Sequence, residues 1–343
     1  MDYKASGVDT EHAAKLIQNL KSVIENTHLG SKAGKVVGGF GGFAGAFRLN
    51  KSFQNHDIVA ATDGVGTKIQ LYRKYRDFSG IGQDLVAMCI NDLYCAGALP
   101  LFFLDYIACG KLDDSWYQPV LRSIANACNY SGIALLGGET AEHPGVMADD
   151  DFDLAGFAVG VSSPKQSLPK PESIREGDKI FSFPSSGLHS NGFSLIRKVL
   201  PQWQKENPAA DSLLANPDFV SRVLLRPTRI YWFVPEMLNE VKIKALVHVT
   251  GGGIYENLPR VLPEGLGAYI HTPSAFDFAP SLIFQNIVPR RAQFSTFNMG
   301  NGMLAIGSAK ILARMHKYDP RVCEIGEVVK SAEKKITLSG IDT

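Results

Sequence analysis

The chain has 343 residues, of which 45% are hydrophobic and 20% charged, and its formal net charge is +1. The length favours two domains, and the near-neutral charge gives no basic surface for nucleic acid, so we expect no nucleic-acid partner. No apolar run is long enough to span a bilayer, so we expect no membrane partner. The N-terminus lacks a signal-peptide pattern, and none of the five cysteines forms a C-x-x-C pair. Both observations favour a cytoplasmic protein.

The first half of the chain alternates apolar segments with turns. Asp9 or Thr10 can cap a helix whose apolar residues up to Ile24 share one face. The segment 34–45 has too many glycines for a helix or a central strand. The later segments predict strands at 57–63, 101–109, 133–140 and 152–162, and helices at 81–97 and 113–132.

The second half begins after a proline-rich stretch, 163–178, that has few apolar residues and predicts a linker. Strands are expected at 179–183, 245–253, 267–271 and 302–307, with helices between them and two short C-terminal strands. Both halves mix strands and helices without strict alternation, so the expected fold class is α+β with two mixed α/β domains. We expect an N-terminal domain over 1–165, a linker over 166–174 and a C-terminal domain over 175–343.

Acidic and amide side chains gather where apolar segments end. Asp63 ends a strand, Asp84 and Asn91 are seven residues apart on one expected helix with Asp92 following, and Glu139 follows "LLGG". Oxygen ligands of this kind suit Mg²⁺, which usually arrives with phosphate groups. Helix capping and salt bridges are the alternative, and for Asp84 both interpretations stay open.

Three glycine-rich turns, 38–42, 185–192 and 250–253, adjoin expected strand ends or helix starts. Backbone N–H groups in such turns bind phosphate, although a plain turn is the alternative. His189 stands between hydrogen-bonding residues in the second turn, which suits either acid/base chemistry or a structural histidine bonded to backbone. The residues alone therefore predict binding of Mg²⁺ and a phosphorylated ligand, but no reaction.

An ordered series of motifs resembles the phosphoribosylformylglycinamidine cyclo-ligase family from about residue 3 to the end of the chain. The motifs are "YKASGVD" (3–9), "GGFGGF" (38–43), "TDGVGTK" (62–68), "IGQDLVAMCINDL" (81–93), "PLFFLDY" (100–106), "GGETAE" (137–142), "AGFAVGV" (155–161), "SSGLHSNGFSLIRK" (185–198), "PTRIY" (227–231), "TGGGIYENLPRVLP" (250–263) and "FNMGNGM" (297–303).

The resemblance implies a ligase that forms a C–N bond in de novo purine biosynthesis. ATP phosphorylates the formamide oxygen of formylglycinamidine ribonucleotide, and an amidine nitrogen attacks the resulting iminophosphate to close an imidazole ring, giving aminoimidazole ribonucleotide, ADP and phosphate. The resemblance also implies ATP and Mg²⁺ as cofactors, an N-terminal domain that binds ATP and metal and pairs its sheet with that of a second subunit in a homodimer, and a C-terminal domain that binds substrate.

The matching motifs imply roles for individual residues. Metal binding is implied for Asp63, Asp84, Asn91, Asp92 and Glu139. ATP binding is implied for Gly39, Gly41, Gly42, Gly64, Gly66, Thr67 and Lys68. Substrate binding is implied for Ser186, His189, Ser190, Asn191, Thr250, Gly251, Gly252, Gly253 and Asn298. Catalytic roles are implied for His189, Asn191 and Lys68.

Some positions depart from the family pattern, notably His143 before "PG" and the acidic segment 146–153. The rival functions within the superfamily are formylglycinamidine ribonucleotide synthetase, thiamine monophosphate kinase, selenophosphate synthetase and a hydrogenase-maturation dehydratase. The last two need a reactive Cys, a selenocysteine or a C-terminal Cys. This chain has no Cys before Cys89 and none after Cys323, which argues against both functions. A catalytically silent nucleotide-binding scaffold is a further alternative, but it predicts loss of the acidic residues.

Overall fold

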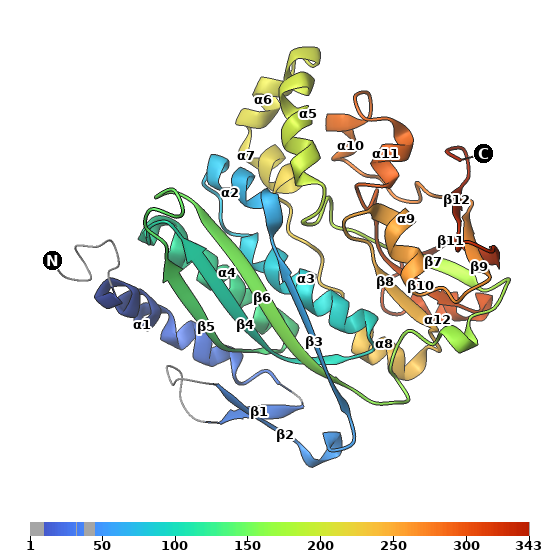
Figure 1. Ribbon diagram of the computed structural model, residues 1–343, viewed down its shortest axis with the longest axis horizontal. Coiled ribbons are helices and arrows are strands. Elements are labelled where there is room, and N and C mark those ends of the chain that lie inside the picture. Colours follow the sequence, from blue (N-terminus) through green and yellow to red (C-terminus); the bar gives the residue numbers. More distant parts are fainter. Residues whose placement is uncertain (1–9, 32, 38–44, 343) are drawn as a thin grey trace. The chain divides into compact units, whose positions relative to one another are not determined.

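The computed structural model describes residues 10–31, 33–37 and 45–342 (Figure 1). The proposed ATP-binding residues Gly39, Gly41 and Gly42 lie outside the described residues. The chain divides into two compact units: one contains the described residues up to Leu93 together with Leu99–Pro164, and the other contains Tyr94–Ala98 and Lys165–Thr343. Each unit is described separately below.

The first unit is built from these helices and strands: α1 Thr10–Thr27, β1 Gly34–Val37, β2 Ala46–Leu49, β3 Asp57–Gly64, α2 Ile69–Tyr75, α3 Ile81–Cys95, β4 Leu99–Cys109, α4 Asp114–Ser131, β5 Ala134–Glu142 and β6 Phe152–Ser162. Its main sheet has the order β3-β6-β4-β5, in which β4 and β5 are parallel and the other pairs antiparallel. A separate antiparallel hairpin, β1–β2, was not predicted from the sequence.

Helices α3 and α4 cover one face of the main sheet (Figure 1). Along β4 the side chains alternate, so that Phe103, Asp105 and Ile107 are buried while the residues between them are partly exposed. A Cβ on Gly156 in β6 would lie 3.0 Å from Cys89 Sγ on α3, which places α3 directly on this face. On the opposite face, Ala33 packs with Leu101 and Val161, and the Phe47 ring of the β1–β2 hairpin lies 5.5 Å from that of Phe102, centroid to centroid.

The second unit is built from these helices and strands: β7 Lys179–Pro184, α5 Phe193–Glu206, α6 Ala210–Ala215, α7 Pro217–Phe219, α8 Val234–Glu240, β8 Ala245–His248, α9 Gly253–Asn257, β9 Leu266–Ile270, α10 Ser281–Phe284, α11 Arg290–Phe294, β10 Asn301–Gly307, α12 Leu312–Met315, β11 Cys323–Lys330 and β12 Ile336–Leu338. The sheet order is β12-β9-β11-β7-β10-β8, with a buried centre: every residue of β8 and β10 is buried. Such continuous burial explains why these strands are mostly apolar rather than alternating, with His248 and Asn301 as their polar residues.

The directions of three strands determine where loops meet in the second unit. Both β7 and β8 are antiparallel to β10 and therefore run in the same direction. Their C-terminal ends and the N-terminal end of β10 consequently lie at one edge of the sheet. The loops that follow β7 and β8 thus meet the segment that precedes β10.

The α+β class predicted from the sequence is confirmed. Of the helices in the described part of the chain, none is both long enough and apolar enough to cross a membrane.

The contact between α3 and α4 depends on a glycine. A Cβ on Gly82 would lie 2.1 Å from the backbone nitrogen of Ile124 and 2.4 Å from the carbonyl carbon of Ser123, so it would force the helix backbones apart. We predict that Gly82→Ala lowers the free energy of unfolding by about 1–3 kcal/mol, because overpacking at backbone outweighs the better helix propensity of alanine. Urea denaturation measures the change.

Gly137→Ala is the matched control, because its Cβ would meet only Leu104 Cδ2 at 3.6 Å, an ordinary contact. Equal destabilisation by the two substitutions would contradict the close helix contact.

Candidate functional site

The segment "TDGVGTK" forms a turn between β3 and α2 whose middle is open to solvent. Gly66 has φ +65°, a conformation that favours glycine, and among the residues that the structure describes none apart from its chain neighbours comes within 4 Å of where its Cβ would be. Gly66 and Thr67 are exposed, and the Gly64 N–H donates to Asp63 Oδ1 at 2.7 Å. The turn therefore presents an exposed glycine backbone, as a phosphate-binding turn requires.

Lys68, at the end of this turn, lies in a buried ion pair. Its Nζ is 2.7 Å from Asp84 Oδ2 on α3, and both side chains are 0% exposed. The Tyr72 hydroxyl donates to the same carboxylate oxygen at 2.5 Å. Burial lowers the pKa of Lys68, and the Asp84 carboxylate opposes that shift. This ion pair matches the salt-bridge interpretation left open for Asp84, and contacts of Lys68 with phosphate and of Asp84 with a metal ion stay predictions.

Asp63 and Asp92 lie near one another around Cys89. The Cys89 thiol is 4.0 Å from the backbone oxygen of Asp63, and burial together with the charges of Asp63 and Asp92 raises the pKa of that thiol. Asp92 is exposed on α3, whereas Asn91 beside it is fully buried. Asp63 and Asp92, from different elements, are thus both brought close to Cys89 by the fold.

Glu139 lies apart from this pair. Asp63 aligns across the sheet with Gly156, Asp105 and Gly138, so Glu139 is one residue further along β5 and faces the opposite side. Strands β3 and β5 are three interstrand spacings apart, roughly 14 Å. Across residues 10–31, 33–37 and 45–342, no three His, Cys, Asp or Glu side chains group to hold a metal ion. A site shared by Asp63 and Glu139 within one chain stays a prediction.

Asp105 is a buried acid in the middle of β4 and is not among the site residues predicted from the sequence. Burial raises its pKa to about 7, and the charge of Glu139 adds to the shift. A Cβ on Gly138 would lie 2.3 Å from Asp105 Oδ1, so the glycine leaves the room that this carboxyl occupies. An acidic residue within the apolar run "LFFLDYIAC" is the sequence signal that could have identified it.

In the second unit, the strand directions bring most of the predicted substrate-binding residues together. The Ser185 N–H donates to Gly300 O at 2.8 Å, and Asn298 Nδ2 donates to Gly187 O at 2.9 Å, so the 185–192 loop is joined to the segment before β10. A Cβ on Gly251 would lie 3.5 Å from Asn191 Oδ1, which brings the "TGGG" turn beside the same loop.

The side chain of His189 is buried, although the residue belongs to the 185–192 loop. The residue is 0% exposed and has φ +61°, which is strained for a residue with a side chain. The Ser186 N–H donates to Nε2 of the ring at 3.3 Å. This contact is the one expected of a structural histidine bonded to backbone, and an acid/base role for His189 stays a prediction.

Hydrogen bonds to the "PTRIY" segment anchor the serines of this loop. Ser186 Oγ donates to Pro227 O at 2.6 Å, and the hydroxyls of Ser190 and Thr228 are 3.4 Å apart. The loop that carries the predicted substrate contacts is therefore held by its own side chains.

Asn257 and His248 are residues of this region that the sequence reading did not select. Asn257 is buried and donates through Nδ2 to Gly251 O at 3.0 Å and Gly253 O at 2.7 Å, closing the "TGGG" turn. The ring centroids of His248 and His189 are 6.1 Å apart. A buried Asn following a glycine turn by four residues, and a His ending a buried strand, are weak signals that depend on knowing the loop contacts.

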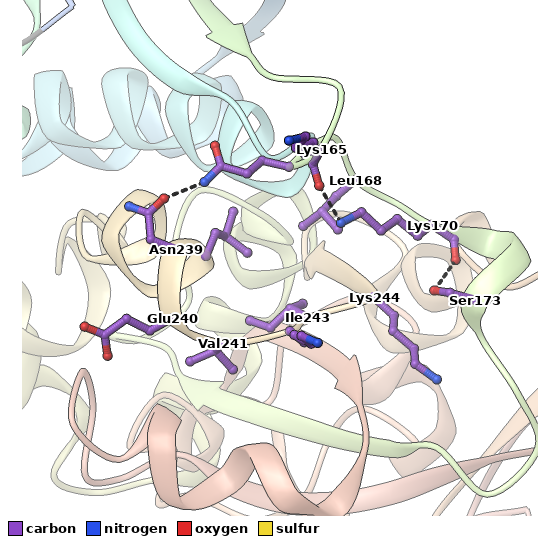
Figure 2. A pocket seen from close by; sticks show the side chains of 12 residues that line it. Lys165, Leu168, Lys170, Ser173, Asn239, Glu240, Val241, Ile243 and Lys244 are labelled. Carbon is purple, nitrogen blue, oxygen red and sulfur yellow. Dashed lines mark hydrogen bonds between the residues drawn. The ribbon is translucent and has the colours of Figure 1, made fainter.

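The second unit also has a pocket of about 480 Å³, which is lined by none of the residues of the 185–192 loop or the "TGGG" turn (Figure 2). It forms where residues 165–173 pack on the end of α8 and on the segment between α8 and β8, and Gln166 Nε2 donates to Asn239 Oδ1 at 2.5 Å. Its lining includes four lysines but none of the predicted site residues. The converging glycine turns, rather than this pocket, are the candidate site.

Comparison with known proteins identifies the family to which the chain is similar. Residues 42–162 match the family described as AIR synthase related protein, N-terminal domain, and residues 175–339 match the corresponding C-terminal domain. A phosphoribosylformylglycinamidine cyclo-ligase of Leptospira interrogans is 43% identical over 344 residues, which cover 97% of each chain.

Two solved structures share the fold at lower identity. Thiamine-monophosphate kinase from Stenotrophomonas maltophilia K279a is 18% identical, with a TM-score of 0.67 over 94% of this chain and 96% of that one. Hydrogenase maturation protein HypE in complex with ATP is 20% identical, with a TM-score of 0.64 over 97% and 92%. At such identity these similarities establish the fold alone.

The raised pKa of Asp105 predicts a pH dependence of stability. The folded state retains the Asp105 proton up to about pH 7, while the unfolded chain releases it near pH 4, so stability falls as pH rises between these values. We expect Asp105→Asn to remove this dependence, so that its stability relative to wild type rises by about 4 kcal/mol at most between pH 4 and pH 8. Urea unfolding without metal or nucleotide measures it.

Asp57→Asn, at an exposed position on β3, is the control and should leave the dependence of wild type unchanged. A constant difference between Asp105→Asn and wild type across that range would contradict a protonated Asp105.

Proposed function

The chain belongs to the phosphoribosylformylglycinamidine cyclo-ligase family, and on that premise we propose that it closes the imidazole ring of aminoimidazole ribonucleotide. The substrates are ATP and formylglycinamidine ribonucleotide, and the other products are ADP and phosphate. The observation that carries the proposal is 43% identity to a named cyclo-ligase over 97% of the chain. The enzyme is an ATP-dependent ligase that forms a C–N bond in purine biosynthesis.

The chemistry sets what the protein must supply. A formamide oxygen leaves poorly, so the γ-phosphoryl group of ATP is transferred to it, and the C–O bond to phosphate breaks when the amidine nitrogen attacks the same carbon. Transfer requires ATP and the formamide oxygen to be aligned, phosphate charge to be balanced, and water to be excluded. The nitrogen loses a proton as the ring closes, and phosphate leaves with the formamide oxygen.

The first unit is proposed to bind MgATP. The backbone of Gly64, Gly66 and Thr67 is proposed to contact the triphosphate, because Gly66 and Thr67 are exposed and the described residues leave open space where a Gly66 side chain would be. Asp63 and Asp92 are the proposed Mg²⁺ ligands, since carboxylate oxygens suit this ion and the two residues lie around Cys89. When bound, Mg²⁺ would balance the charge of the phosphates.

The second unit is proposed to bind formylglycinamidine ribonucleotide. The "TGGG" turn, closed by Asn257, would hold the ribose 5-phosphate with its backbone N–H groups. Asn191, beside this turn, is the proposed contact to the formamide or amidine group. His189 would orient the loop and exchange protons with substrate only if the loop opens, because its ring is buried.

The rival functions fit less well. The kinase and the hydrogenase maturation protein are 18% and 20% identical, against 43% for the cyclo-ligase. A silent scaffold would have no use for the acidic residues, yet Asp63, Asp92 and Glu139 are all present. Purified protein with ATP, Mg²⁺ and formylglycinamidine ribonucleotide should form an aminoimidazole product. ADP without that product would favour a kinase or a silent ATPase instead.

Asp92→Asn tests the metal assignment. The substitution keeps the size of the side chain and removes its charge at an exposed position, so we expect the fold to persist while turnover falls by roughly 100-fold or more. A rate assay over a range of Mg²⁺ concentrations measures the loss.

Asp57→Asn, at another exposed carboxylate of the same unit, should retain wild-type turnover. Wild-type turnover in Asp92→Asn would mean that Asp92 has no part in catalysis.

Assembly as a cytoplasmic homodimer through the open face of the first sheet is also proposed. Phe157 is 43% exposed and lies opposite Leu104 and Thr62 on that face, and Ile58 is 72% exposed nearby on β3. A patch of apolar side chains on a sheet favours pairing with a second copy. Pairing would also bring Glu139, which faces this side, to the interface region.

Phe157→Lys should weaken the dimer, because it places a charge where the two sheets would meet. We expect the dissociation constant to rise by roughly tenfold or more, measured by sedimentation velocity across a dilution series. Leu29→Lys is the matched control, at a position that is 86% exposed after α1, and it should dimerise as wild type does. A wild-type monomer with full activity would contradict the dimer.

A further inference from the structure

We propose that Lys68, Asp84 and Tyr72 form a buried clamp that holds the turn Asp63–Lys68 in the shape that MgATP requires. In this proposal Lys68 and Asp84 are positioning residues and contact neither phosphate nor metal. The proposal rests on the proposed function, because the ligand of the turn is the ATP of that reaction.

The clamp joins three elements that the reaction uses. Lys68 ends the turn, Tyr72 lies one helical turn further along in α2, and Asp84 is on α3. Both Lys68 Nζ and the Tyr72 hydroxyl reach Asp84 Oδ2, at 2.7 and 2.5 Å, and Lys68 Nζ lies 5.4 Å from the Tyr72 ring centroid. One carboxylate oxygen therefore binds the turn and the helix after it to α3.

The other end of the turn also contacts α3. The Cys89 thiol, on the same helix as Asp84, reaches the backbone oxygen of Asp63 at 4.0 Å. Asp92 follows Cys89 on this helix, so α3 carries both the clamp and a proposed metal ligand. A shift of the turn along α3 would change the spacing between Asp63 and Asp92.

The turn also contains an exposed glycine between its two ends. Gly66 and Thr67 are exposed, and within the described residues no atom beyond the chain neighbours of Gly66 lies within 4 Å of where its Cβ would be. A turn that is fixed at both ends and open in the middle loses little conformational entropy when it binds a ligand. The clamp thus acts through preorganisation of backbone rather than by its own charge.

Burial argues against direct contact between Lys68 and phosphate. The Lys68 side chain is 0% exposed and its ammonium is matched by Asp84, so reaching a phosphate would require it to leave a buried carboxylate without its partner. Removing one partner of a buried pair is strongly destabilising, whereas replacing the whole pair by apolar residues is often neutral. A buried pair therefore adds little net stability, and its value lies in fixing which arrangement forms.

The test therefore replaces all three residues of the clamp at once rather than one partner of the ion pair. In the triple variant Lys68→Met, Tyr72→Phe, Asp84→Leu, all the polar groups of the clamp are removed together, leaving no buried charge behind. Thr27→Val is the matched control, because it removes another buried hydroxyl of the first unit, which accepts from the Leu135 N–H at 2.8 Å far along the chain from the turn.

Two measurements are made on each protein. Hydrogen exchange without ligand should be at least tenfold faster than in wild type for amides 63–68 of the triple variant, with α4 and β5 still protected. The dissociation constant for MgATP, from calorimetry, and the KM for ATP should both rise at least tenfold, while the KM for formylglycinamidine ribonucleotide changes little. Thr27→Val should match wild type in all of these.

The clamp proposal is overturned if the triple variant exchanges amides 63–68 at the wild-type rate and binds MgATP with wild-type affinity. A loss of kcat with unchanged exchange at 63–68 would also overturn it, because Lys68 would then act on phosphate directly. If the triple variant does not fold, Tyr72→Phe decides, since it keeps the ion pair and should still speed exchange at 63–68 several-fold. If wild type neither binds MgATP nor forms the aminoimidazole product, the proposed function fails, and exchange alone decides the clamp.

Discussion

The ion pair between Lys68 and Asp84 is the constraint on which the first unit depends. Two opposite charges that are both 0% exposed can only stay charged together, so their contact fixes how the turn after β3 meets α3. The rest of the first site follows from that meeting. Asp63 is at the start of the turn, Asp92 is two helical turns beyond Asp84, and the open backbone at Gly66 lies between the ends.

In the second unit the corresponding constraint is the direction of strands rather than a charge. Because β7 and β8 both pair antiparallel with β10, loops that are some 60 residues apart in the chain are delivered to one sheet edge. Side-chain amides then join them, with Asn298 bonded to Gly187 and Asn257 bonded across the "TGGG" turn. The two units thus hold their turns by different means, one by a buried pair and the other by topology completed with amide bonds.

Much of the fold could be predicted from the sequence because its signals are local. Apolar runs bounded by glycines identified most of the strands in both sheets, and their irregular order gave the α+β class. The β1–β2 hairpin was missed because its strands are four residues long and flank a glycine-rich segment. The many short helices of the second unit were also difficult, since four or five residues carry little periodicity.

The candidate site was predicted less evenly, because burial and register are properties of the folded chain. The spacing of Asp84 and Asn91 showed that they share a helix, but nothing in it showed that Lys68 would be directed at Asp84. Glu139 and Asp63 both end strands, yet only the sheet order reveals that two strands separate them. Asp105 is visible in the sequence as an acid within an apolar run, but only the folded chain shows that its carboxyl is buried and that its pKa is raised.

The backbone of His189 has a consequence for how this loop can evolve or be engineered. A residue with a Cβ is about 1–2 kcal/mol less favourable than glycine in a left-handed conformation, and the chain does use glycine for such conformations at Gly192 and Gly252. A search for more stable variants would therefore tend to favour glycine at this position and discard the imidazole. Selection for thermostability alone would thus replace His189 by glycine. A variant library designed for higher stability should therefore keep His189 unchanged.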